Sequence, residues 1–107
     1  MFTVYLAQEF GTDLSNRRAA ACLRSRIEHA PVIAGCWIID CTNVRTISDS
    51  FADELFAILV CERGHEWFKA NVKLAGLSAD VRETILEAVK HRLDTSPPFR
   101  GATPPGW

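Results

Sequence analysis

The residues most suited to binding or modification lie between positions 48 and 54, where two hydroxyls and three carboxylates occur close together. A hydroxyl there could accept a phosphate or cap a helix, and the acids could present negative charge to a partner. Ser50 and Asp53 fit the S-x-x-D capping box, which predicts a helix that begins at Phe51. The candidate partner-binding and regulatory residues are Ser48, Asp49, Ser50, Asp53 and Glu54, together called the junction, with Ser48 and Ser50 as candidate phosphorylation sites.

Other reactive residue types do not form a catalytic or metal-binding pattern. The four cysteines lack the C-x-x-C spacing of zinc and redox sites and are expected to be reduced and buried; they are Cys22, Cys36, Cys41 and Cys61. Cys61 and His65 have the i,i+4 spacing of a nucleophile and its base, but no third group to orient the base is visible. No glycine-rich phosphate loop is present either. We therefore expect no metal, no cofactor and no enzymatic activity.

The elements before the junction must deliver it to the end of a buried strand. Residues 2–7 (FTVYLA) predict a first strand, and the apolar spacing of residues 14–30 predicts an amphipathic helix. Residues 32–39 are apolar at odd and even positions alike and are followed by Asp40. Because successive side chains of a strand point to opposite faces, this pattern indicates a central strand covered on both faces. Residues 42–47 then form a loop that leads to the junction.

The elements after the junction complete the predicted fold. A helix runs from Phe51 to about Arg63, a third strand covers residues 68–74, and a last helix follows a cap at Ser78 and ends near Leu93. The order β-α-β-α-β-α predicts a small single α/β domain over residues 1–93, with a largely parallel or mixed sheet and helices packed on it. Residues 94–107, rich in proline and glycine, are expected to be an irregular tail.

Charge and hydropathy narrow the classes of partner. The 107 residues carry 12 Lys and Arg against 13 Asp and Glu, and a net charge of -1 argues against nucleic acid. The longest apolar stretch has eight residues against the roughly 20 that span a bilayer, so no membrane segment is expected. The first residues do not resemble a secretory signal, which indicates a cytoplasmic protein. The segment from Asp49 to Glu66 contains five acidic residues and one arginine. This local negative charge favours a protein partner with a basic surface.

The junction and its flanking residues resemble a known family. Asp40 at a strand end, the step from Val44 to Ile47, and the run SDSFADELF at residues 48–56 are similar to the STAS-like domain family, relatives of sulfate-transporter and anti-sigma-factor-antagonist domains. Residues 16–20 and 71–74 also resemble that family, so the similarity covers residues 1–93. It implies a non-enzymatic bacterial signalling module that binds a protein, such as a kinase-like ATPase or an anti-sigma factor.

The sequence departs from that family at the phosphoacceptor. In anti-sigma-factor antagonists the junction usually reads Asp-Ser-Ser/Thr-Gly, and Asp49 here occupies the position of the acceptor hydroxyl while Phe51 replaces the glycine. Either Ser48 or Ser50 is modified instead, or Asp49 supplies a permanent negative charge. An alternative function is a small-molecule or nucleotide-binding sensor of the same fold, with a pocket at the strand ends near Trp37 or Trp67. Association with a second copy also stays open.

Overall fold

Three parallel strands form the main sheet of the protein, in the order β1-β3-β5. The computed structural model describes residues 2–30 and 36–95. Strand β1 (Phe2–Tyr5) pairs with β3 (Trp37–Asp40), and β3 pairs with β5 (Val72–Ala75). Strand β3 is therefore central, as its apolar sequence predicted, and the fold is a small α/β domain with a parallel sheet.

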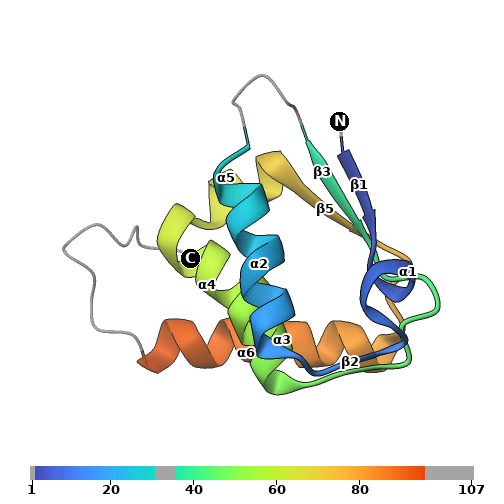
Figure 1. The fold of residues 1–107 in the computed structure, drawn as a ribbon. Coiled ribbons are helices and arrows are strands. Elements are labelled where there is room, and N and C mark those ends of the chain that lie inside the picture. The colour runs from blue at the N-terminus through green and yellow to red at the C-terminus, as the bar shows by residue number, and fades with distance from the viewer. Residues whose placement is uncertain (1, 31–35, 96–107) are drawn as a thin grey trace.

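Within the part of the chain that the structure describes, helices cover one face of the sheet. In Figure 1, the helices α2 (Arg17–Glu28), α3 (Asp49–Ala52), α4 (Ile58–Arg63) and α5 (His65–Asn71) gather on one side of the three strands. Trp37 and Ile39 of β3 point to that side and are buried, whereas Ile38 between them is half-buried. On the same outer face as Ile38, Tyr5 and Lys73 are exposed. The expectation that the central strand is covered on both faces was therefore wrong for β3.

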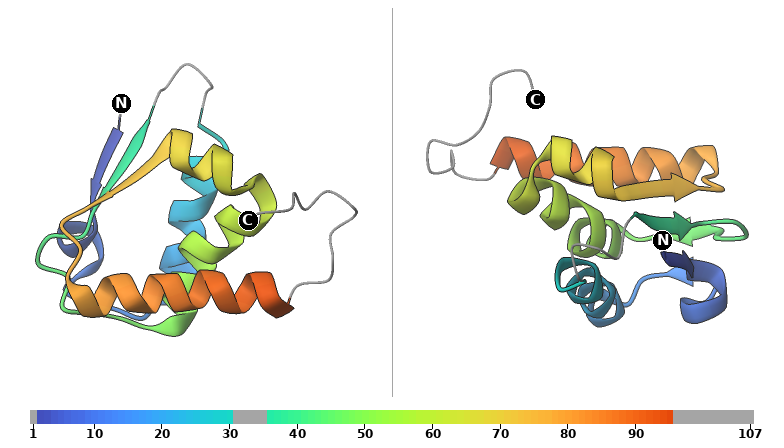
Figure 2. Two further views of the ribbon diagram at one scale, coloured as in Figure 1. Left: turned by 180° about the vertical axis from the view of Figure 1, so that it is seen from behind. Right: turned by 90° about the horizontal axis from the view of Figure 1, so that it is seen from above.

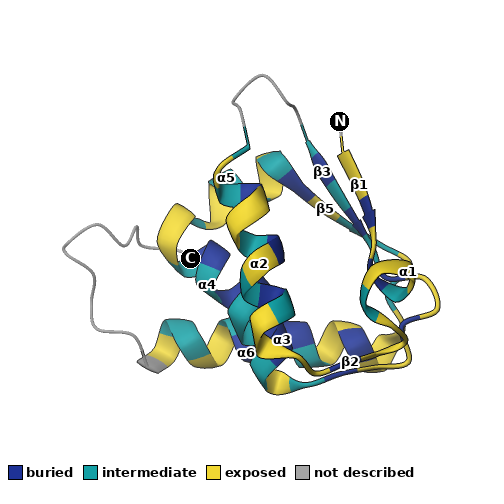
Figure 3. Cartoon of the chain, viewed as in Figure 1, coloured by how far each residue is buried: buried dark blue, intermediate teal, exposed yellow. Residues whose placement is uncertain are grey.

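The core lies between this sheet and a layer of helices. Figure 2 shows the segment from α3 to α4 lying between α2 and α6, and the buried positions gather between the helices and the sheet (Figure 3). The helices are α2 (Arg17–Glu28), α3 (Asp49–Ala52), α4 (Ile58–Arg63), α5 (His65–Asn71) and α6 (Ala79–Thr95), with a π-helical turn η2 (Asp53–Ala57) joining α3 to α4. Phe51, Leu55 and Leu59 are fully buried, and each such side chain stabilises the fold by ~1.5–3 kcal/mol.

Two short elements near the amino end were not expected from the sequence. The predicted first strand ends at Tyr5, where helix α1 (Leu6–Phe10) begins. Strand β2 (Asp13–Leu14) pairs in parallel with β4 (Thr46–Ile47). Helix α2 begins only at Arg17, because the Asn16 side chain caps it by accepting a hydrogen bond from the backbone N–H of Ala19 at 3.0 Å.

The predicted third strand was wrong over most of its length. Residues 65–71 form helix α5, and strand β5 begins only at Val72. Apolar residues at every second position between 68 and 74 imitate a strand, but residues 68–71 belong to helix α5. The Arg63 guanidinium lies 5.2 Å from the centre of the Trp67 ring, and the Asn71 side chain donates to the Trp67 carbonyl. The first contact holds α5 against the end of α4, and the second lies within α5.

The last helix agrees with its predicted start. The Ser78 hydroxyl accepts a hydrogen bond from the backbone N–H of Val81, and α6 continues to Thr95, two residues beyond the predicted end of the domain. The expected irregular tail from 96 onward, and residues 32–35 of the predicted central strand, lie outside the described residues. Within residues 2–30 and 36–95, none of the helices combines the length and apolar character that crossing a bilayer requires.

Candidate functional site

The short β2–β4 pair positions the junction. The backbone N–H of Arg45 donates to the Thr12 carbonyl at 2.7 Å, and the N–H of Ser48 donates to the Leu14 carbonyl at the same distance. These bonds fix the chain immediately before helix α3 against the chain that enters α2. The start of α3 is therefore anchored to a second segment more than 30 residues away.

Ser48, rather than Ser50, caps the helix. Its backbone is extended and its hydroxyl accepts a hydrogen bond from the N–H of Phe51 at 3.1 Å, so α3 begins at Asp49. The predicted Ser50–Asp53 capping box was wrong, because Asp53 binds elsewhere. The Ser50 hydroxyl lies 3.1 Å from the Ser48 hydroxyl, and both side chains are half-buried. Asp49, between them, is exposed.

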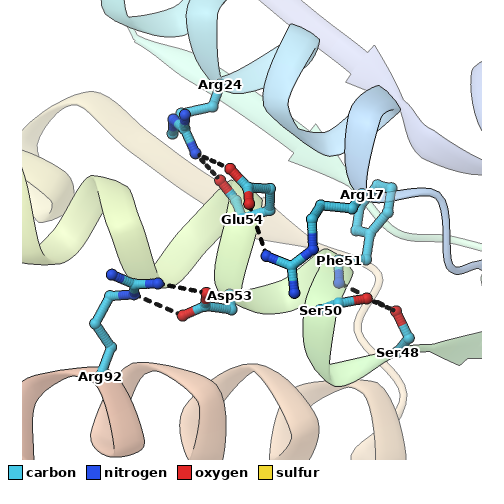
Figure 4. Close-up of polar contacts among 8 residues, drawn as sticks. All are labelled: Arg17, Arg24, Ser48, Ser50, Phe51, Asp53, Glu54 and Arg92. Carbon is cyan, nitrogen blue, oxygen red and sulfur yellow. Dashed lines mark hydrogen bonds and ion pairs between the residues drawn. The ribbon is translucent and has the colours of Figure 1, made fainter. Parts of the chain in front are cut away.

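Asp53 is paired with an arginine from the last helix. Arg92 Nε donates to Asp53 Oδ1 at 2.7 Å, and Arg92 Nη2 donates to Oδ2 at 2.6 Å (Figure 4). Such a bidentate pair is stronger and more directional than a single contact. The hydrogen bonds from Arg92 lower the pKa of Asp53, against a smaller opposing effect of burial. This carboxylate therefore fastens η2 to α6.

Glu54 is paired with two arginines of α2. Its Oε1 accepts from Arg17 Nη1 at 2.8 Å and its Oε2 accepts from Arg24 Nη1 at 2.6 Å. Burial of this carboxyl raises its pKa, but the hydrogen bonds from Arg24 and Arg17 outweigh burial, so the net pKa of Glu54 is lowered. Figure 4 shows Asp53 and Glu54 pointing to opposite sides, toward α6 and α2 respectively.

Arg24 also binds the backbone of the π-helical turn. The N–H of Ile58 bonds to the Asp53 carbonyl five residues earlier, which widens the helix at this point. Arg24 Nη1 donates to the next carbonyl, that of Glu54, at 2.6 Å. The Arg24 guanidinium thus donates hydrogen bonds to both the side-chain carboxylate and the backbone carbonyl of Glu54. These bonds stabilise the wide turn that carries Asp53 and Glu54. Single π-turns occur frequently at functional sites.

These contacts change the electrostatics expected from the sequence. The five acids between Asp49 and Glu66 suggested a surface open to a basic partner. In the structure, Asp53 and Glu54 are neutralised by arginines from other helices, and Asp49 is the exposed acid of the junction. The sequence carried one overlooked signal: Arg17 and Arg24 are seven positions apart and so lie on one face of α2.

The cysteines are only partly buried. Cys41 is buried, Cys36 and Cys61 are half-buried, and Cys22 is exposed, so the expectation of burial was wrong for Cys22. Burial raises the pKa of the Cys41 thiol to about 11, aided by the nearby charge of Asp40. Among the residues that the structure describes, no three metal-ligating side chains lie close enough together to hold a metal ion.

Comparison with known proteins does not assign the chain to a family. No family model matches it, and no curated protein or solved structure is significantly similar to it. The STAS-like resemblance of the junction therefore stays a prediction. The function has to be argued from the geometry of the junction and of its neighbours.

Proposed function

We propose that this protein is a non-enzymatic, cytoplasmic signalling module that binds another protein through the junction. The observation that carries the proposal is the set of arginine contacts: Arg92 holds Asp53 from α6, while Arg17 and Arg24 hold Glu54 from α2. Asp49 meanwhile stays exposed. Three helices are thereby locked around one exposed acid at the start of α3.

A rigid surface of this kind favours binding. Ordering a flexible side chain on association costs ~0.5–1.5 kcal/mol, and side chains already fixed in the free protein avoid that cost. Asp53 and Glu54 act here as positioning residues, whereas Asp49 and Ser50 would make contact with the partner. Arg17, whose side chain is 57% exposed, lies beside them and adds a positive group to the same surface.

The proposed partner is a kinase-like ATPase or an anti-sigma factor of a bacterial cell, as the resemblance to anti-sigma-factor antagonists suggests. The test is an affinity pull-down from native lysate with wild type, Asp49→Arg and a matched control, Asp94→Arg. Asp94 is an exposed acid near the end of α6. The recovered protein is then purified and its Kd measured with each variant.

We expect Asp49→Arg to weaken the complex at least tenfold, which corresponds to ~1.4 kcal/mol, because like-charge contacts oppose binding. Asp94→Arg should leave the Kd within about twofold. Equal melting temperatures would show that both variants are folded. The proposal is wrong if Asp49→Arg binds as wild type does, or if no protein is recovered by wild type above background.

The role of Asp49 as a permanent charge has its own test. Asp49→Ser restores a hydroxyl where the resembling family carries its phosphoacceptor. If Asp49 substitutes for a phosphoserine, this variant should change partner affinity, and phosphorylation of the new hydroxyl should reverse the change. An unchanged affinity in Asp49→Ser would remove Asp49 from the interface. Mass spectrometry of the wild-type protein would then show whether Ser48 or Ser50 carries a phosphate.

A further inference from the structure

A small pocket opens at the carboxyl ends of strands β1 and β3, separate from the junction. It has a volume of about 200 Å³, smaller than the roughly 300–1,000 Å³ of sites that take drug-sized ligands. Its walls are formed by Tyr5, Ala7, Gln8, Asp40, Thr42 and Asn43. The carboxyl ends of parallel strands are where open α/β sheets bind ligands. Neither Trp37 nor Trp67, considered earlier for such a pocket, is part of this lining.

The Asp40 carboxylate in this pocket is ionised and held in place. Thr42 donates its backbone N–H to Asp40 Oδ1 at 2.8 Å, and hydrogen bonds from Thr42 lower the pKa of this carboxyl. The loop that carries Thr42 is itself fixed, because the N–H of Cys41 donates to the Ala75 carbonyl at 2.7 Å. Asp40 therefore presents a fixed negative charge.

That charge has no cationic partner among residues 2–30 and 36–95, where the ion pairs involve other carboxylates. Lys73 of β5 lies on the same face of the main sheet, but it pairs with Ile38, two residues before Asp40. It forms no ion pair with Asp40. A bound cation would find this carboxylate available to pair with it.

The other lining groups fit one kind of cation. Tyr5 is the direct neighbour of Asp40 on β1, and the residue is 48% exposed. An aromatic face beside a carboxylate suits a guanidinium, which stacks on the ring and donates a fork of N–H groups to the carboxylate. Gln8 and Asn43 line the same pocket, and a side-chain amide oxygen of either residue could accept the remaining N–H groups.

From this geometry we infer that the pocket binds the guanidinium group of a small free molecule, with Asp40 as the charge partner and Tyr5 as the stacking platform. The inference is independent of the junction and of any protein partner, because its residues lie on β1, β3 and the adjoining segments. Loss of one site would leave the other unaffected.

The test is an NMR titration of the full chain with methylguanidinium, observed through its backbone amides. We expect saturable shifts at Gln8, Thr42 and Asn43. Asp40→Asn should weaken binding at least tenfold, since it removes the charge but keeps an oxygen for the Thr42 N–H. The matched control Asp80→Asn, at an exposed acid of α6, should leave the affinity unchanged.

Three further comparisons test which chemical group the pocket recognises. Ethylammonium should bind more weakly than methylguanidinium, because it lacks the planar fork. Lys73→Met should strengthen binding about twofold by removing a competing cation. N-acetylarginine methylamide should bind no more tightly than methylguanidinium if the natural ligand is a free molecule. Tighter binding of that peptide analogue would instead identify an arginine of a partner protein and overturn the assignment to a free ligand.

The inference fails if methylguanidinium produces no saturable shift, or if Asp40→Asn binds it as wild type does. It also fails if ethylammonium binds equally well, since the pocket would then recognise charge without the shape of a guanidinium. Unchanged amide spectra away from the pocket would show that Asp40→Asn is folded. A loss of binding in that variant therefore reports on the carboxylate itself.

Discussion

Removing Arg92 should cost measurable stability, because its pair with Asp53 joins the last helix to the junction. The two hydrogen bonds are short, 2.7 and 2.6 Å, and link residues 39 positions apart. Hydrogen bonds to charged groups contribute ~1.5–3 kcal/mol, but the side chains are 35% and 22% exposed, so water screens the pair. We expect a coupling energy of about 1 kcal/mol, or roughly 4–8 °C in Tm.

A double-mutant cycle measures this coupling. Arg92→Met, Asp53→Asn and the double variant are unfolded in urea at pH 7, and the non-additive part of their free energies of unfolding is the pair energy. The matched control is Arg26→Met. The distance from Arg26 to Glu9 is longer, 3.3 Å, and the two side chains are more exposed, 51% and 40%. The free energy of unfolding should therefore fall by less than ~0.5 kcal/mol in this control.

The coupling energy between Arg92 and Asp53 should depend on pH, in a direction set by the pKa of Asp53. Arg92 lowers the pKa of Asp53 in the folded protein, so the pair's contribution is fully present above the unfolded pKa of about 3.9 and is lost as pH falls through the lower folded value. The coupling should therefore shrink steadily below about pH 4. A coupling below ~0.3 kcal/mol at pH 7, or one undiminished in acid, would refute the reasoning.

Two further predictions concern the loop after β3 and Gly76, the residue after β5 that faces it. Gly76→Ala should destabilise the protein by about 1–3 kcal/mol in urea unfolding, because the backbone has φ +69° and the new Cβ would clash with Thr42 Oγ1 and with the Thr42 backbone nitrogen, 2.7 Å away; a loss below ~0.5 kcal/mol would contradict this. Cys41, buried with its thiol pKa raised to about 11, should react with iodoacetamide at pH 8 far more slowly than exposed Cys22, as peptide mass spectrometry would show; equal rates would contradict its burial.

The sequence predicted the parts of the fold that local pattern controls. The apolar run ending at Asp40 placed a strand in the middle of a parallel sheet, and Ser78 marked the start of the last helix. Residues 68–74 were misassigned because their alternating apolar positions satisfied a strand pattern, although Arg63, Trp67 and Asn71 have the i,i+4 spacing of contacts seen in helices. Local periodicity alone could not separate the two.

The junction shows the same limit at the level of single residues. The sequence indicated a helix start in this stretch, but it favoured Ser50 over Ser48 as the cap because Asp53 fits a capping box with Ser50. Asp53 is instead held by Arg92 and Glu54 by Arg24, residues 39 and 30 positions away. Charge counted along the chain cannot reveal such pairs, since they depend on how α2 and α6 pack around η2.

The central position of β3 also has a consequence for the order of folding. Phe2 pairs with Trp37, and Trp37 pairs with Val72, so each strand pairing closes a segment of about 35 residues. Closing such segments is entropically slow, whereas the helices between them form from local contacts. Both pairings require β3, so we expect the sheet to assemble late and in one cooperative step. Trimming Ile39, fully buried at the centre of that strand, should therefore speed unfolding more than it slows folding.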